Sequence, residues 1–138
     1  GCVVCCGFPR RARTRRLNSM LIAGPDGEVV ETYDKHFLYA SDKTWAEPGD
    51  GFLTLRSLPG VPLSPVGLGI CMDINPCEFE APPDAFEFAN HHKEAGARLI
   101  VFSSAWCSNH PEDIPEAYVR KPDDQVSQET LSAWMGRL

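Results

Sequence analysis

The stretch VGLGICMDINP, residues 66–76, decides the fold that the sequence predicts. Its first six residues are an apolar run interrupted only by glycines, which is typical of a short buried strand. DAFEFANHHKEAGA, residues 84–97, then has the pattern of a helix, with Asp84 expected to cap it and Gly96 to end it. A second buried strand is expected in ARLIVFSSAW, residues 97–106. Strand, helix and strand in this order predict a βαβ unit with parallel strands, and therefore an α/β fold.

The residues before this unit predict further strands. CVVCCGFPRR, residues 2–11, is expected to form a strand that ends at Pro9, and the basic residues 10–16 are expected to form a solvated loop, with a local anion site as the alternative. LNSMLIAGPDGEVVETYDKHFLY, residues 17–39, predicts a hairpin because GPDG separates two β-prone runs. FLTLRSL, residues 52–58, predicts one more strand after a loop rich in Asp, Gly and Pro.

The last third of the chain is less regular. Residues 107–124 contain several prolines and predict an exposed loop, whereas residues 125–138 predict an amphipathic helix. A chain of 138 residues, 43% of them hydrophobic, is long enough for one ordinary domain and too short for two. We therefore treat residues 1–138 as one domain.

Composition excludes several classes of function. A net charge of −6 argues against a nucleic-acid partner, and the chain has no run of about 20 apolar residues, so we expect a soluble protein that does not enter a membrane. The six cysteines have neither the spacing of a disulfide framework nor that of zinc ligands, which favours reduced thiols, a cytoplasmic location and no metal or other cofactor. Cys2, Cys5, Cys6 and Cys107 are expected to be buried packing residues.

Two residues remain as candidates for chemistry. Cys71 is placed at the carboxyl end of the predicted strand, where open α/β sheets carry their functional residues and where free backbone N–H groups favour a thiolate. The alternative for Cys71 is a buried structural cysteine. Lys35 lies in an aromatic β-prone run, and alternation puts Tyr33, Lys35 and Phe37 on one face. If that face is near Cys71, the ammonium stabilises a negative oxygen; otherwise Lys35 is a solvated surface residue.

These two segments resemble the lysine and cysteine motifs of the nitrilase, or carbon–nitrogen hydrolase, superfamily. NSMLIAGPDGEVVETYDKHFLY, residues 18–39, is similar to a strand bearing Asn-Ser, a Pro-Asp-Gly turn and a Tyr-x-Lys-x-x-Leu strand. GLGICMDINP, residues 67–76, is similar to the Gly-x-x-Ile-Cys-x-Asp elbow. CGFPRR, KHFLYASDKTWAEPG, ICMDINPCEFEAP, FEFA and LSAWMGRL resemble one branch, the protein N-terminal asparagine amidohydrolases. The likeness runs from about Cys5 to the last residue.

The resemblance implies a fold and a set of site residues. The fold is a four-layer αββα sandwich, of which residues 1–138 form an incomplete part that lacks N-terminal and C-terminal pieces. By resemblance Cys71 is the nucleophile and Lys35 stabilises the intermediate. Glu47 resembles the glutamate that supports the lysine, with a solvated loop residue as the alternative. Asp73 resembles the aspartate that shapes the elbow rather than taking protons, with a simple turn former as the alternative.

The resemblance also implies a reaction. Members of this branch remove the side-chain amide from an N-terminal Asn, and in some cases Gln, and release ammonia; the acidic end is then read by the N-degron system in ubiquitin-dependent protein catabolism. The expected partners are protein or peptide N-termini, and a homo-oligomer is possible. The family's general base is a glutamate well before the lysine, and no glutamate precedes Glu28 in this chain. We therefore expect the chain to begin after the base and to be inactive or poorly soluble alone.

Other interpretations share part of this evidence. A general small-molecule ω-amidase or nitrilase uses the same Lys35 and Cys71, and a catalytically dead scaffold is expected if the base is absent in nature. A metal-binding or redox protein is disfavoured by the cysteine spacing. For a substrate with a free ammonium, the acidic residues nearest the cysteine in sequence are Asp73, Glu78 and Glu80. The sequence leaves the preference for Asn or Gln and the oligomeric state open.

Overall fold

The computed structural model describes residues 1–82, 84–105, 132 and 136. The chain divides into two compact units, Gly1–Ser104 and Ala105–Leu138. The strands and helices with printed bounds below all belong to the first unit. The loop expected at residues 107–124, with Cys107, lies outside the described residues, as does most of the helix expected at residues 125–138.

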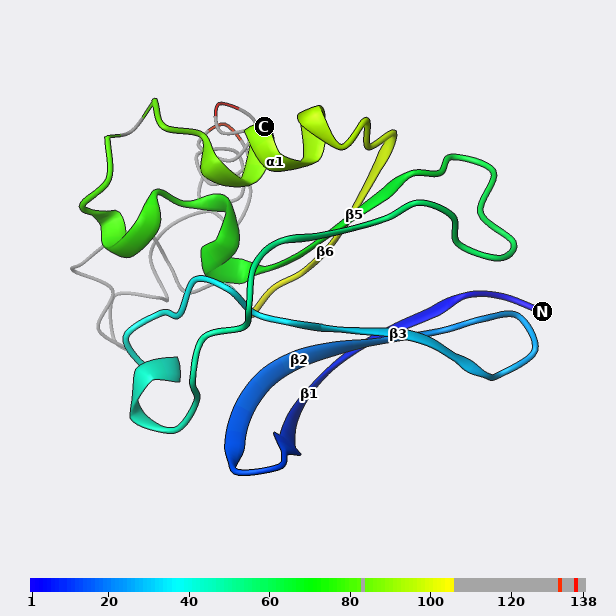
Figure 1. Cartoon of the computed structure of the whole chain (residues 1–138), viewed down its shortest axis with the longest axis horizontal. Coiled ribbons are helices and arrows are strands. Elements are labelled where there is room, and N and C mark those ends of the chain that lie inside the picture. The colour runs from blue at the N-terminus through cyan, green and yellow to red at the C-terminus, as the bar shows by residue number, and fades with distance from the viewer. Residues whose placement is uncertain (83, 106–131, 133–135, 137–138) are drawn as a thin grey trace, which may run out of the picture. The chain divides into compact units, whose positions relative to one another are not determined.

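Two three-stranded sheets make up the first unit (Figure 1). The first sheet is antiparallel, with the strands β1 Val4–Ala12, β2 Arg15–Ala23 and β3 Val29–Asp34 in that order. The second sheet has the order β4 Leu53–Leu55, β5 Val66–Ile70 and β6 Leu99–Ser103. Strand β6 runs parallel to β5, and the helix α1, Glu87–Glu94, connects them in the chain. The predicted βαβ unit is confirmed, and so is the hairpin of β2 and β3.

The basic residues 10–16 form the tip of the first hairpin rather than a loop between separate strands. The predicted end of the strand at Pro9 is wrong, because β1 continues to Ala12. Among the described strands, β1 lies at the edge of its sheet and pairs with β2 on one side, and a proline is tolerated in an edge strand. Arg10 binds the carboxylate of Asp34 through Nε, at 2.8 Å, and Nη2, at 2.5 Å, so its charge is already compensated.

A second departure from expectation concerns Cys2, which precedes β1, and Cys5 and Cys6, which belong to this edge strand. Cys2, Cys5 and Cys6 are exposed free thiols rather than buried packing residues. A β-prone apolar run predicts a strand, but it does not tell whether other strands flank it on both sides. Here β1 has a single neighbour in its sheet, so more of its surface meets solvent.

Two glycines of β5 let the helix α1 pack directly on the second sheet. A Cβ atom added at Gly67 would lie 2.6 Å from Nδ1 of His92, and one at Gly69 would lie 2.6 Å from Cε2 of Phe88. Both distances are far too short for any larger residue to fit without movement. The glycines of the VGLGIC run therefore mark the place where the helix and the sheet approach most closely.

The helix α1 is shorter than the expected span of residues 84–97. Phe86 precedes it with a left-handed backbone, φ 45°, so the helix cannot extend further back and Asp84 does not cap it. The expected end agrees better with the structure, because Gly96 closes the helix with a φ of 72°.

Alternation along β5 creates the core between the two sheets. With its glycines toward α1, the other residues of β5 point to the first sheet and meet side chains of β2 and β3. The buried residues of this core are Met20, Ile22, Tyr33, Leu58, Val66, Leu68 and Ile70. The described part of the chain thus has a helix layer, a sheet layer and a second sheet layer in sequence (Figure 1), as in three layers of the expected αββα sandwich.

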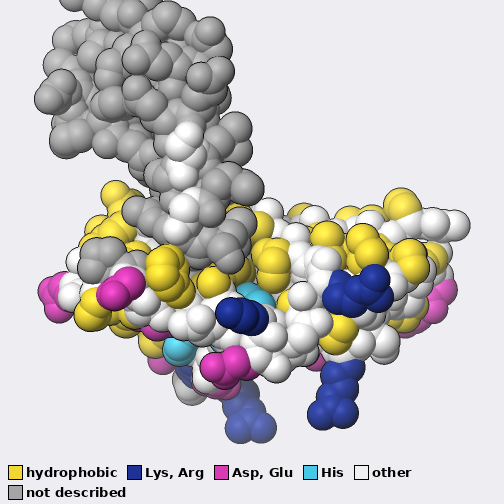
Figure 2. All heavy atoms as spheres, turned by 90° about the horizontal axis from the view of Figure 1, so that it is seen from above, with side chains coloured by type: hydrophobic (Ala, Val, Ile, Leu, Met, Phe, Trp, Pro, Cys, Tyr) yellow, Lys and Arg dark blue, Asp and Glu magenta, His cyan; other side chains and the backbone are white. Residues whose placement is uncertain are grey.

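The surface of this unit carries both charged and apolar side chains (Figure 2). Large apolar residues that are exposed are Val4, Val29, Tyr39, Trp45, Leu63, Phe79 and Phe86. Within the described ranges, no helix has the length and apolar character needed to cross a membrane.

Candidate active site

Cys71 begins the chain's exit from β5. The strand ends at Ile70, and Cys71 opens a short 3-10 helix, η2, Cys71–Ile74, with a left-handed φ of 48°. A non-glycine residue rarely adopts this conformation, which is found most often at tight turns and functional sites. The thiol is half-buried. The sequence-based position of Cys71 at the carboxyl end of a buried strand agrees with this placement.

Asp73 lies two residues further on and is fully buried, at 0% exposure. Its Oδ2 accepts hydrogen bonds from the Tyr33 hydroxyl and the Ile70 N–H, both at 2.8 Å. Its Oδ1 accepts the backbone N–H groups of His36, at 3.1 Å, and Phe37, at 2.8 Å. The carboxylate therefore ties the segment that leaves β3 to the turn that leaves β5.

Burial and hydrogen bonding act on Asp73 in opposite directions. Burial raises the pKa of the Asp73 carboxyl, whereas the backbone N–H groups of Phe37 and Ile70 favour the ionised form and oppose the rise. Burial and the neighbouring Asp73 also raise the pKa of Tyr33, which keeps its hydroxyl protonated and able to donate. The positive charge of the nearby Lys35 also opposes the rise in the pKa of Asp73.

Lys35 is the first residue after β3 and is 2% exposed. Its backbone is held on both sides, since its N–H donates to the Asn18 carbonyl at 2.8 Å and its carbonyl accepts the Gly49 N–H at 2.7 Å. Tyr33 and Lys35 are both buried, as expected for one face of the run. The Nζ atom donates to Oδ2 of Asp42 at 2.5 Å.

Asp73 is what links the two candidate residues. It accepts a hydrogen bond from His36, the residue after Lys35, and one from Ile70, the residue before Cys71. The structure therefore brings the lysine segment and the cysteine segment together at the end of β5, although β3 and β5 belong to different sheets.

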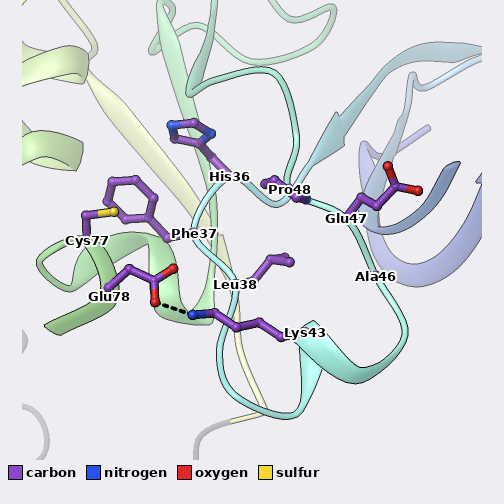
Figure 3. Close-up of a pocket in the computed structure, with 9 residues that line it drawn as sticks. All are labelled: His36, Phe37, Leu38, Lys43, Ala46, Glu47, Pro48, Cys77 and Glu78. Atoms are coloured by element: carbon purple, nitrogen blue, oxygen red, sulfur yellow. Dashed lines mark hydrogen bonds and ion pairs between the residues drawn. The ribbon is translucent and has the colours of Figure 1, made fainter.

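Glu47 is not in contact with Lys35 in the described structure. Its side chain is 56% exposed, and its Oε2 lies 3.9 Å from Nε of Arg15. Figure 3 shows its carboxylate turned away from the other labelled side chains. The carboxylate beside the lysine belongs to Asp42, whose Oδ2 lies 2.5 Å from Nζ of Lys35. The supporting role that the resemblance implies for Glu47 stays a prediction. No local pattern in the sequence distinguishes Asp42, because it lies in a polar loop with two other acidic residues, Glu47 and Asp50.

A cavity of about 580 Å³ opens beside the lysine segment. Its walls come from the residues after Lys35, from the loop around Asp42 and from the turn after η2; they are His36, Phe37, Leu38, Lys43, Ala46, Glu47, Pro48, Cys77 and Glu78 (Figure 3). An ion pair between Lys43 and Glu78 joins two of these segments. Cys77 faces this space with a pKa that burial and the neighbouring Glu78 raise, so its thiol stays protonated.

The described part of the chain contains no group of three or more His, Cys, Asp or Glu side chains that could bind a metal ion. His91 and His92 are neighbours on α1, and only His92 is buried. Nδ1 of His92 lies 2.7 Å from the Thr54 hydroxyl, and burial lowers the pKa of His92 to about 4. We assign it to packing between α1 and the second sheet.

Known proteins resemble this chain in both sequence and structure. No protein-family model matches it. The chain is 40% identical over 120 residues to a protein N-terminal amidase of Schizosaccharomyces pombe. This match covers 76% of the chain and 41% of that protein. A protein N-terminal amidase of Saccharomyces cerevisiae is 30% identical over 124 residues, 78% of this chain and 27% of that protein. The chain thus spans less than half the length of these relatives.

Solved structures show the same fold at lower identity. An N-terminal amidase with an Asn-Glu-Ala peptide superimposes with a TM-score of 0.70 at 23% identity, over 93% of this chain and 33% of that one. A carbon–nitrogen hydrolase from Helicobacter pylori superimposes with a TM-score of 0.64 at 20% identity, over 98% of this chain and 40% of that one. The α/β arrangement described above is therefore the corresponding part of this fold.

Proposed function

We propose that this chain, which has the carbon–nitrogen hydrolase fold and is related in sequence to the protein N-terminal amidases, carries the nucleophile of a cysteine amidohydrolase. The proposed reaction converts the side-chain carboxamide of an N-terminal Asn, or Gln, into a carboxylate and releases ammonia. The observation that carries the proposal is the Asp73 carboxylate, which joins the segment of Lys35 to the turn of Cys71. The relationship to the amidases supplies the choice of substrate.

The chemistry follows from a thiol and a fixed positive charge. The Cys71 thiolate attacks the amide carbon, and the carbonyl oxygen becomes an oxyanion that the Lys35 ammonium stabilises. The C–N bond then breaks, ammonia leaves with a proton, and a thioester remains on Cys71. Water attacks the thioester, the C–S bond breaks, and the acid and the free thiol are released. Splitting the hydrolysis in this way replaces one difficult step by two easier ones.

The proton transfers require a general base that we do not assign in this chain. In the family this base is a glutamate before the lysine, and the chain has no glutamate before Glu28. Because the chain spans less than half the length of the amidases that it resembles, activity assays should use the full-length gene product.

The free ammonium of the substrate needs an acidic partner. Of the three acids considered from the sequence, Asp73 is saturated by four donors and is not available. Glu78 lines the cavity in an ion pair with Lys43, and Glu80 is exposed. The solved N-terminal amidases include complexes with Asn-Glu and Gln-Val peptides. We extend this substrate class, protein or peptide N-termini bearing Asn or Gln, to this chain, with entry into the N-degron pathway as its consequence.

Ammonia release from an Asn-Glu-Ala peptide tests the proposal. The complete gene product is expected to release ammonia, the Cys71→Ser variant to lose nearly all of this activity, and Cys6→Ser, an exposed thiol on β1, to keep it. N-terminal acetylation should abolish turnover if the ammonium is recognised.

Each remaining outcome rejects a specific part of the proposal. Equal rates on the acetylated peptide indicate the general ω-amidase or nitrilase instead. An absence of turnover from every amide by the folded complete product indicates the dead scaffold.

A further inference from the structure

Lys35 and Asp42 form a buried ion pair in the described structure. Nζ and Oδ2 are 2.5 Å apart, and the two side chains are 2% and 10% exposed. A buried ammonium is costly unless an opposite charge compensates it, and Asp42 is the partner that the structure provides. The pair is therefore part of how the lysine keeps its place.

The carboxylate of Asp42 is itself held on both oxygens. The Tyr39 N–H donates to Oδ2 at 2.9 Å, and Nδ2 of Asn18 donates to Oδ1 at 3.0 Å. Burial favours the neutral acid, but the hydrogen bonds from Lys35 and Tyr39 outweigh it and hold the pKa of Asp42 below its usual value. Asp42 is thus a fixed anion with one oxygen aimed at the lysine.

The backbone of Asp42 is tied as well. Its carbonyl accepts the N–H groups of Trp45, at 3.0 Å, and Ala46, at 2.7 Å, in the short 3-10 helix η1, Asp42–Thr44, and the turn after it. This turn leads into the wall of the cavity, which includes Lys43, Ala46 and Glu47. One residue therefore connects the lysine, the strand β2 and the cavity wall.

We propose that Asp42, held by Asn18, is the positioning residue that fixes the Lys35 ammonium where the oxyanion forms. This inference rests on the proposed function of Lys35. It assigns to Asp42 the support that the sequence resemblance had suggested for Glu47. Glu47 contacts Arg15 instead. A positioning residue acts through the lysine, so its loss is expected to lower kcat while leaving peptide binding nearly unchanged.

Kinetics of four variants of the complete gene product test this assignment. We expect Asp42→Asn to lower kcat about 100-fold with KM changed less than about threefold, because a misplaced charge loses most of its effect on the transition state. Asp42→Glu keeps the charge and is expected to recover part of the loss. Glu47→Gln is expected to cost far less, and Asp50→Asn, a matched change at a side chain 90% exposed, about nothing.

Each result decides between the assignments. The inference is overturned if Asp42→Asn keeps the parent kcat, if Glu47→Gln costs more than Asp42→Asn, or if Asp42→Asn raises KM alone. Circular dichroism identifies a variant that has failed to fold, and the Asp42→Glu variant then carries the kinetic test.

A stability measurement separates this inference from the proposed function. If the parent protein releases no ammonia, the function fails, and a double-mutant cycle of Asp42→Asn and Lys35→Met in urea unfolding decides the pairing. Strong coupling between the two changes is expected for the buried pair. Additive effects would overturn the inference whatever the enzyme does.

Discussion

Asp73 is the residue whose removal should most disturb the junction between the two candidate segments. Replacing it by alanine leaves four buried donors without their acceptor: the Tyr33 hydroxyl and the N–H groups of Ile70, His36 and Phe37. A buried donor without a partner costs about 1–3 kcal/mol, so the four together cost about 4–12 kcal/mol. Relief from burying the charge of Asp73 offsets part of this cost, and we expect a net loss of about 4 kcal/mol.

Two milder changes at the same place should follow in a defined order. Tyr33→Phe removes one donor and should cost about 1–2 kcal/mol. In Asp73→Asn the new amide nitrogen can donate to the Tyr33 oxygen, but one backbone N–H, that of Ile70, still loses its acceptor. We therefore expect about 2–3 kcal/mol for this variant, between the other two.

Urea unfolding of the complete gene product measures these differences as shifts of the midpoint at constant slope. Asp50→Ala is the control, because this carboxylate is 90% exposed and pairs with Arg15 at the surface; it should change stability by less than about 0.5 kcal/mol. If Asp73→Ala proves as harmless as Asp50→Ala, Asp73 is only a turn former and the argument that it joins the two segments fails.

Two further predictions concern the contact of α1 with the second sheet. Gly69→Ala should destabilise the protein by about 1–3 kcal/mol in urea unfolding, because the new methyl group meets the ring of Phe88. Gly7→Ala is the control and should cost less, because its methyl group would lie 3.3 Å from the nearest atom, Oγ of Ser103. Equal costs for the two variants would refute close packing of α1 on the second sheet. The pKa of His92 is about 4 in the folded protein and 6.5 in the unfolded chain, so the unfolded chain takes up the proton first as the pH falls. The free energy of unfolding should therefore drop by about 2–3 kcal/mol between pH 7 and 4.5. His92→Asn should flatten this drop, and an unchanged pH dependence would contradict it.

Local patterns in the sequence predict most of the described secondary structure. The hairpin of β2 and β3, the strand β5 and the parallel strand β6 follow from apolar runs and turn residues that lie next to one another in the chain. The errors occur where the answer depends on distant neighbours. A strand can continue past Pro9 because β1 is an edge strand. Cys5 is exposed, and in the described sheet β1 has a neighbouring strand on one side only.

The same limit applies to the candidate site. Cys71 and Lys35 stand out because a thiol after a buried strand and a lysine in an aromatic run are locally unusual. Their connection is not local, since the Tyr33 hydroxyl reaches Asp73 across 40 positions of sequence. A pattern that identifies Asp73 as a turn residue contains no information about the three donors that come from β3 and from the segment after it.

The contrast between Asp42 and Glu47 has its origin in the backbone of one loop. At Asp42 the chain enters a tight turn, and the N–H of Tyr39 already binds the Asp42 carboxylate, so this acid folds back toward the lysine seven positions before it. Glu47 lies after the turn, and its N–H donates to the Arg16 carbonyl at 2.8 Å, which holds this part of the loop along β2 and turns the side chain outward. Both acids are near Lys35 in sequence, but a side chain reaches a buried partner only if its backbone is aimed there. A turn of a few residues therefore decides which of the two carboxylates contacts Lys35 and which one lies at the surface beside Arg15.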